Sequence, residues 1–492
     1  MHRPQAVITV FFSLLCVVFL GAAFAVTEAV RLTGSHAFCA DAVSLGNWSL
    51  FSEYENSLLE DYELFGVDGA YGGGHFDPDH LKTRLEVFLH ENTDPGKGIG
   101  EKLPGITLDP WKVSLKGSRI VHYALLTDHS GEYFYQQAVE YMYKTGWVNA
   151  LDKLRDAFSA KRTLEAESEL SKDSKASAKE MAPYEKNLKE AKNNTSGSDP
   201  GSVVIIAQGE EAAELDRLER EGRKKNPLEK IDSLRRSDLL TLVCGQKPVS
   251  KQALKKGVLF SGRKKNKGSL QLDTPRGGYA DNLLFWQYLL DHFINFTGKK
   301  KNTALHYQTE YLICGRLNDR ANLKSVVRRL LLIREAMNYA VLVTDGPSNA
   351  EVQELALLIA GWSGSMVITQ ALKHALLLGW AFGESLFDVR VLLHEGRVPL
   401  YKTRADWNIP LSRLIDLEIE LKRADRASEW SSGGLDYEDY LRFLISLTPV
   451  SRLKARALDM IELNLRQNKE SSEFSIDNCV VGILTETQWD VR

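Results

Sequence analysis

The sequence predicts a mainly α protein (α+β) with a small β element, and three observations lead to this fold class. The first is an uncharged, proline-free stretch of 21 residues near the N-terminus, Ala6 to Val26. The second is a series of apolar segments with helical periodicity between Asp281 and Leu393. The third is an alternating segment, Ile476 to Trp489, which indicates an edge strand or a hairpin. We therefore expect a single N-terminal transmembrane helix that continues into a stalk, an apolar helical bundle, a charged helical hairpin and a small β element.

The N-terminal apolar stretch predicts a membrane anchor. A helix of ~20 apolar residues spans the hydrocarbon core of a bilayer, whereas the apolar run of a signal peptide has only ~7–15 residues. Ala23 and Ala25 form a small-residue pair that is typical of a cleavage site. Removal of the stretch therefore stays open as the alternative to a retained anchor.

The flanks of this stretch predict its orientation. Arg3 lies on the N-terminal side, and Glu28 is the first charged residue on the other side. Positive charge in short flanks favours the cytoplasmic side. We expect residues 1–5 to form a cytoplasmic tail, residues 6–26 to span the cell membrane once, and the large domain to lie outside.

The anchor helix is expected to continue beyond the membrane, because residues 28–65 contain no proline. Residues 27–150 are predicted to form this stalk helix and a small α/β region. We expect the apolar stripe of the stalk to pack on the protein's own domain, and the alternative is a pilin-like stalk whose stripe packs against a partner helix. The stripe recurs at steps of three or four residues and consists of Leu45, Trp48, Phe51, Tyr54, Leu58, Tyr62 and Phe65.

Composition and charge exclude one class of partner and point to another. The net charge is −3 at pH 7, which lacks the strongly basic character of nucleic-acid-binding proteins. Residues 151–236 are rich in polar helix formers and predict charged helical arms with a disordered tip near 191–202. These arms, which include a potential coiled-coil contact, are expected to bind protein partners. The basic run at 263–267 is expected to be a solvated loop.

The remaining part of the chain, residues 237–492, is predicted to be a helical bundle domain that ends in the β element. Helices as apolar as these pack against one another in the centre of a bundle. A stretch of 15 apolar residues, Leu355 to Thr369, is too short for a second membrane span. The expected helices cover residues 283–296, 323–344, 351–360, 369–393, 435–446 and 451–466.

Polar residues within the apolar helices form the candidate site. Burying a charge costs several kcal/mol unless the charge is paired, so we expect Arg334 or Arg390 to meet the carboxylates. We interpret the set as a buried polar network that fixes the packing of the helices. A carboxylate cluster that binds a ligand or a metal between bundle helices is the alternative. The set consists of Arg334, Glu335, Asn338, Glu384, Asp388 and Arg390.

The sequence contains no phosphate-binding loop, no GxSxG or HExxH motif and no paired-cysteine metal site. We therefore expect no catalytic residues, no cofactor and no metal. Four cysteines follow the anchor, and an oxidising compartment would allow them to form two disulfides. The alternative, which we favour, is that they are small buried hydrophobic residues. These four are Cys39, Cys244, Cys314 and Cys479.

Two resemblances to known families imply where the protein works. The opening VITVFFSLLCVVFLGAAFAVTEAVRL, followed by Ala37, Ala40 and Ala42, resembles the anchors of TadE/TadG-like proteins, the pseudopilin-like components of tight-adherence (Flp-type) pilus systems. The stretches SLFSEYENSLLEDYELFGVDGAYG, NLKSVVRRLLLIREAMNYAVLVTD, AFGESLFDVRVLL and LDYEDYLRFLISL are similar to uncharacterised, membrane-anchored proteins of Gram-positive bacteria whose genes accompany Tad-type pilus genes. The resemblance implies a non-enzymatic component of a Tad-like pilus or secretion assembly. A membrane-tethered enzyme or sensor that uses the carboxylates is the second hypothesis.

Overall fold

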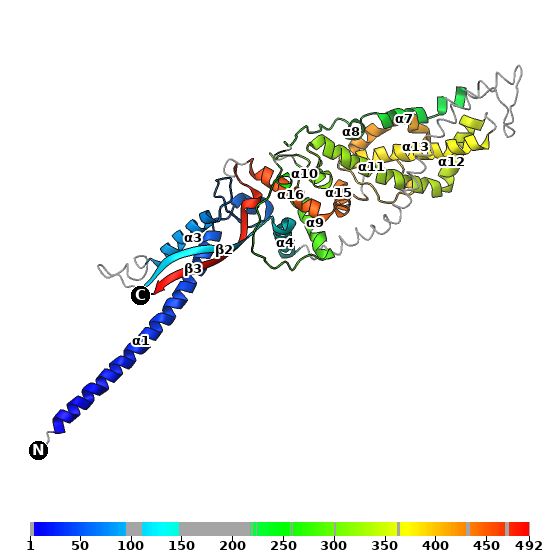
Figure 1. Cartoon of the computed structure of the whole chain (residues 1–492). Helices are drawn as coiled ribbons and strands as arrows, with labels where there is room; N and C mark the ends of the chain where they lie inside the picture. Colours follow the sequence, from blue (N-terminus) through cyan, green and yellow to red (C-terminus); the bar gives the residue numbers. More distant parts are fainter. Residues whose placement is uncertain are drawn as a thin grey trace. The chain divides into compact units, whose positions relative to one another are not determined.

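The protein is mainly helical and contains a three-stranded sheet, which confirms the predicted fold class (Figure 1). The predicted tip near 191–202, and the arms as far as residue 216, lie outside the residues that the structure describes. The computed structural model describes residues 4–94, 111–146, 217, 220–222, 224–255, 257, 259–299, 302–361, 365–429, 433–467 and 472–491.

The chain forms two compact units, and neither is a continuous stretch of sequence. Unit 1 consists of Met1–Tyr141, Leu259–Gly277 and Ile461–Arg492. Unit 2 consists of Met142–Val258 and Gly278–Met460. This division differs from the contiguous ranges expected from composition, because the C-terminal strand pairs with strands from the first part of the chain.

Unit 1 is built around a long helix and a narrow sheet. Two helices, α4 (Asp128–Lys144) and α16 (Val450–Leu465), carry the chain from one unit into the other. The other main elements of unit 1 are α1 (Pro4–Phe51), α2 (Asn56–Tyr62), α3 (Pro78–Thr93), β1 (Val67–Asp68), β2 (Val113–Leu125) and β3 (Cys479–Val491).

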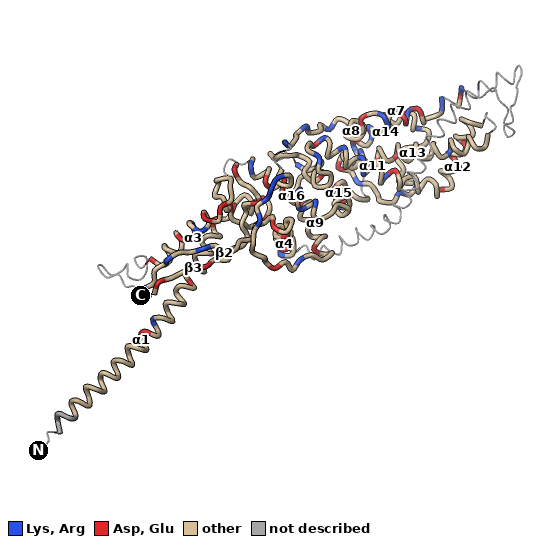
Figure 2. Tube along the Cα trace, in the orientation of Figure 1, with Lys and Arg blue, Asp and Glu red and all other residues tan. Residues whose placement is uncertain are grey.

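The first half of α1 is exposed and apolar, and its second half is packed. α1 is continuous over 48 residues, and Figure 2 shows no charged residue along its first half. Among the described residues, α1 is the one helix long and apolar enough to cross a membrane. A signal sequence can meet the same criterion of length and hydropathy, so these properties define a candidate single span or signal anchor.

The packed half of α1 faces α3, and only part of the predicted stripe is buried. A Cβ on Gly46 would lie 2.8 Å from a methyl carbon of Leu89, so glycine permits this close approach. The side chain of Leu50 is buried beside the same helix, whereas Leu45 is 54% exposed and Trp48 is 77% exposed. Gly46 and Leu50 thus form the contact with α3, whereas Leu45 and Trp48, two members of the predicted stripe, face outward.

The sheet of unit 1 has the strand order β1-β3-β2 and is antiparallel. β2 is one strand with irregularities in its register against β3. The predicted C-terminal strand is confirmed as β3, but it is the central strand of the sheet and not the edge strand or hairpin that was expected. α3 covers the sheet, and the buried core between them contains Leu50, Val67, Phe76, Leu81, Leu85, Leu89, Leu125 and Val480.

The basic run at 263–267 is fixed to unit 1 by its first residue, which corrects the expectation of a solvated loop. Arg263 pairs with Glu462 through Nη1 at 2.5 Å and Nη2 at 2.7 Å. The same guanidinium also pairs with Asp477, and the backbone N–H of Asn266 donates to that carboxylate at 3.1 Å. These contacts join the loop to the residues that precede β3.

Unit 2 is the predicted helical bundle, and its centre is the pair α11 (Asp319–Thr344) and α13 (Met366–Leu393). Every residue of α13 from Ala375 to Leu393 is buried. The apolar stretch Leu355–Thr369 is divided between α12 and α13, which pack against each other. The surrounding helices are α7 (Leu228–Arg236), α8 (Leu239–Cys244), α9 (Tyr279–His292), α10 (Gln308–Cys314), α12 (Gly346–Ala360), α14 (Leu417–Leu421) and α15 (Tyr437–Ser446).

Candidate functional site

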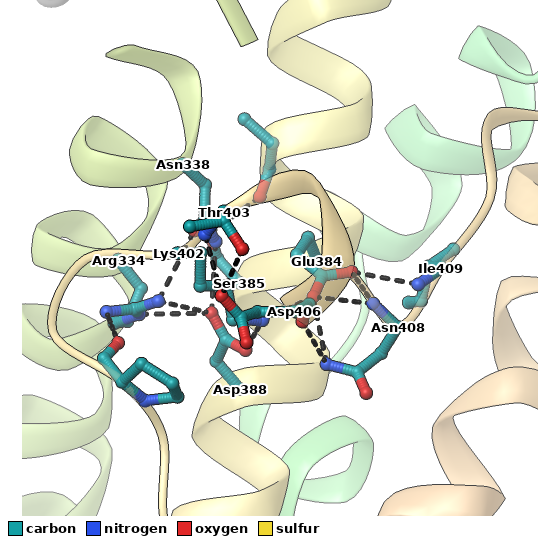
Figure 3. Close-up of polar contacts among 12 residues, drawn as sticks. Arg334, Asn338, Glu384, Ser385, Asp388, Lys402, Thr403, Asp406, Asn408 and Ile409 are labelled. Atoms are coloured by element: carbon teal, nitrogen blue, oxygen red, sulfur yellow. Dashed lines mark hydrogen bonds and ion pairs between the residues drawn. The ribbon is translucent and has the colours of Figure 1, made fainter. Parts of the chain in front are cut away.

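The structure gathers four of the six candidate residues into one buried cluster in unit 2 (Figure 3). Arg334 and Asn338 lie one turn apart on α11, and Glu384 and Asp388 lie one turn apart on α13. This spacing places each pair on the facing sides of the two packed helices. A fifth member, Lys402, comes from the loop that follows α13. We call these five residues the charged cluster.

Arg334 connects the two helices to the loop. Its Nε donates to Asp388 Oδ2 at 3.0 Å, and its Nη1 donates to the carbonyl oxygens of Pro399 and Leu400 at 2.9 Å each. Nη1 also donates to the Tyr440 hydroxyl at 3.1 Å. The guanidinium is fully buried, and these partners satisfy donors that would otherwise be costly to desolvate.

Glu384 holds the loop from the other side. Its carboxylate accepts from the backbone N–H of Asn408 at 3.1 Å and from that of Ile409 at 3.0 Å. Lys402 Nζ lies between Glu384 and Asp388 and pairs with both. The indole N–H of Trp380, one turn before Glu384, donates to the Ile409 carbonyl at 2.7 Å. The loop from 399 to 409 is therefore held by α11 at its start and by α13 at Lys402, Asn408 and Ile409.

The charges of the cluster balance, and the pKa shifts follow from burial and pairing. Burial disfavours ionisation of Asp388, but the adjacent charges of Lys402 and Arg334 hold its pKa below the usual value. Burial raises the pKa of Glu384 although Lys402 lies beside it. Burial opposes the charge of Lys402, and the two carboxylates more than offset this by raising its pKa. Two cations and two carboxylates thus form a neutral set.

Each carboxylate oxygen of the cluster already accepts at least one hydrogen bond. Asp388 Oδ2 accepts from Arg334 and from Asn338 Nδ2, the latter at 3.0 Å, and Asp388 Oδ1 pairs with Lys402. Both oxygens of Glu384 accept backbone N–H groups. Among the residues with described positions, no group of three or more His, Cys, Asp or Glu is arranged to hold a metal ion. These hydrogen bonds are compatible with the structural interpretation of the cluster, which stays a prediction.

Glu335 and Arg390 lie outside the charged cluster. Glu335, on the outer side of α11, pairs with Arg235 of α7 at 2.5 Å. Arg390 pairs with Asp425 at 2.5 Å and donates to the Leu242 carbonyl at 2.7 Å. Position on the helix explains this, because neither residue shares the face that Arg334 or Asp388 presents to the other helix.

Lys402, Asn408 and Tyr440 belong to the site, although sequence reasoning did not include them. The sequence contained a signal for a second cation, although not for its position. Two carboxylates one turn apart on a buried helix require two cations, and Arg334 supplies only one. The backbone N–H donors of the loop carry no signal in the sequence, because every residue except proline has one.

The four cysteines that follow the anchor have free thiols. Cys244 and Cys479 are buried, and Cys39 and Cys314 are half-buried. Burial raises the pKa of Cys244 to about 12 and also raises that of Cys479. A raised pKa reduces the thiolate fraction and with it the reactivity of these groups.

Fold and site together define a mainly helical protein with one candidate membrane-spanning helix and a buried charged cluster. Residues 217–491, more than half of the chain, match a family of unknown function (DUF5702), and the protein belongs to this family. A search of curated proteins and a search of solved structures find no match.

Proposed function

We propose that the protein is a non-enzymatic, membrane-anchored component of an extracytoplasmic assembly, such as a Tad-like pilus or secretion machine. The observation that carries the proposal is the continuity of α1. One helix includes both the exposed apolar segment that fits a bilayer and the half that packs on α3. One continuous helix thus joins the candidate membrane segment to the packed part of unit 1, and this supports an anchored protein.

The outward face of α1 supports a role in protein contacts. Leu45 and Trp48, three residues apart on the helix, are both more than half exposed, and they lie beyond the predicted span. Large exposed apolar side chains close to one another commonly mark a surface that another protein covers. The predicted orientation, with residues 1–5 inside the cell, would place this surface outside it, where pilus and secretion components assemble.

Protease treatment of intact cells, followed by mass spectrometry, tests the membrane part of this proposal. We expect peptides from Glu28 onward to be released and residues 6–26 to remain in the membrane. Protection of the whole chain would contradict the proposed orientation. Release of the complete chain, including residues 6–26, would contradict the anchor.

A photo-crosslinking amino acid at Trp48 tests the partner. We expect it to join the protein to another component of a membrane assembly when the gene is expressed with its neighbours. Tyr279 is a matched control position, because it is an aromatic residue of unit 2 with 56% exposure. Crosslinking at both positions alike, or at neither, would contradict a specific contact surface on α1.

A further inference from the structure

A second buried carboxyl group, that of Glu310, lies in unit 2 in a setting unlike the charged cluster. It belongs to α10 and is fully buried. Its Oε1 accepts two hydrogen bonds at 2.8 Å, from the backbone N–H of Phe296 and from the hydroxyl of Tyr437. Its Oε2 is buried and has no hydrogen-bond partner. The group thus joins α10 to the start of α15 and to the turn that follows α9.

The groups that face Glu310 provide no positive charge. Within the described chain Glu310 forms no ion pair, in contrast to Glu384 and Asp388. An ionised carboxylate at this place would leave one oxygen without a hydrogen bond in a buried environment, which is strongly unfavourable. The titratable groups that interact with it are Asp319 of α11, Tyr307 before α10, Cys314 of α10 and Tyr437 of α15, with Cys244 of α8 next to Tyr437.

We propose that Glu310 is a proton-controlled latch, which holds α10, α15 and the 293–298 turn together when it is protonated and loosens them when it ionises. The latch is independent of the proposed assembly function. It makes the local order of unit 2 respond to the pH of the compartment in which that unit lies.

The pKa of Glu310 supports this geometry. Burial raises it to about 7, and the hydrogen bonds from Phe296 and Tyr437 offset only part of the rise. In an opened state the carboxyl group would return to the ordinary value for Glu, about 4.3. The closed state binds the proton more tightly, so the stability of the closure is full in acid and is lost as pH rises through about 7.

Hydrogen exchange of the full-length protein in detergent micelles tests the latch. After correction for the intrinsic effect of pH, we expect amide protection in α15 and the 293–298 turn to fall about tenfold between about pH 6 and pH 8.5. The variant Glu310→Gln keeps a neutral, hydrogen-bonding side chain and should remove this pH dependence. The control Glu395→Gln changes a carboxylate that is 62% exposed and should keep the wild-type profile.

The variant Tyr437→Phe provides a second test that does not depend on the folding of Glu310→Gln. It removes a hydrogen bond that favours the ionised carboxylate, so the transition should move to higher pH. Protection that is independent of pH in the wild type would overturn the proposal. An unchanged transition in Glu310→Gln, or a transition in Tyr437→Phe that stays in place or moves to lower pH, would overturn it as well.

Discussion

Two long apolar helices, α1 and α13, have similar compositions but opposite environments. The first half of α1 is exposed along its length and carries no charge (Figure 2). α13 is buried along most of its length and still contains Glu384, Asp388 and Arg390. Both helices are rich in Leu, Val, Ala and Phe. Hydrophobicity alone therefore does not separate a candidate membrane span from the central helix of a bundle.

The difference lies in what each helix has around it. Lipid offers no partner to a charged side chain, so a span excludes such residues. The protein interior brings Arg334 from α11 and Lys402 from the following loop to the carboxylates of α13. Charge on an apolar helix thus indicates partner elements, and a complete lack of charge over about 20 residues indicates a bilayer.

The largest effect should come from removing one charge of the cluster. Asp388→Ala leaves Arg334 and Lys402 buried with only Glu384 to balance them. Breaking a buried ion pair in this way typically costs about 3–5 kcal/mol of the free energy of unfolding. Urea unfolding of the purified full-length protein, followed by fluorescence and by circular dichroism, measures the loss.

Glu335→Ala is the matched control for this experiment. Glu335 lies on α11 and pairs with Arg235, and the two side chains are 17% and 35% exposed, so solvent reaches this pair. Pairs of this kind contribute up to about 1 kcal/mol. If Asp388→Ala lost no more stability than Glu335→Ala, the cluster would not be the element that fixes α11, α13 and the loop.

A charge placed in α1 should have the next largest effect. Val17 is 66% exposed near the middle of the candidate span. An arginine at the centre of a membrane helix costs about 2.5–3.5 kcal/mol on insertion scales. We expect Val17→Arg to reduce the share of the protein that stays in carbonate-washed membranes, as measured by immunoblotting.

Leu45→Arg provides the comparison within the same helix. Leu45 is 54% exposed but lies beyond the predicted span, so its replacement should leave the membrane fraction unchanged. Equal retention of Val17→Arg and the wild type would show that residues 6–26 are not held in the bilayer. Equal loss in both variants would point to a folding defect of α1.

The elements of the fold were largely predictable, because each depends on local pattern. Periodicity identified α11, α12, α13, α15 and α16, and alternation identified β3. The face on which α1 packs was not predictable from its apolar stripe. Gly46 allows α3 to approach, and the leucines of α3 cover that side, whereas Trp48 remains exposed. Which face is buried depends on the shape of the neighbour, and shape is not a property of one helix.

The site was predictable in part for a related reason. Buried carboxylates need a positive partner, so Glu384 and Asp388 predicted a contact with Arg334. This was possible because all three residues lie on helices that their periodicity reveals. Lys402 and Asn408 lie in an irregular loop, and no periodicity relates them to α13. The sequence did not indicate that Glu310 is buried. Its helix, α10, has only seven residues, which is too short for a pattern that would show burial on all sides.

Acid titration should produce the smallest effect, and it distinguishes the carboxylates of the cluster. The pKa of Asp388 is held below its usual value, so its contribution to stability is complete above the unfolded value of about 3.9. That contribution is lost as pH falls from there through the lower folded value. Glu384 has a raised pKa and changes in the opposite direction.

The variant Asp388→Asn isolates this contribution, since it shares Glu384 and Glu310 with the wild type. Below about pH 4, the free energy of unfolding of the wild type should fall more steeply than that of the variant, by up to about 1.4 kcal/mol per pH unit for one proton. Urea midpoints measured at intervals between about pH 5 and pH 3 give both slopes. Parallel slopes would mean that Asp388 has the same pKa in the folded and unfolded chains. The ion pairs of this carboxylate would then not be what distinguishes the buried helix α13 from the uncharged segment of α1.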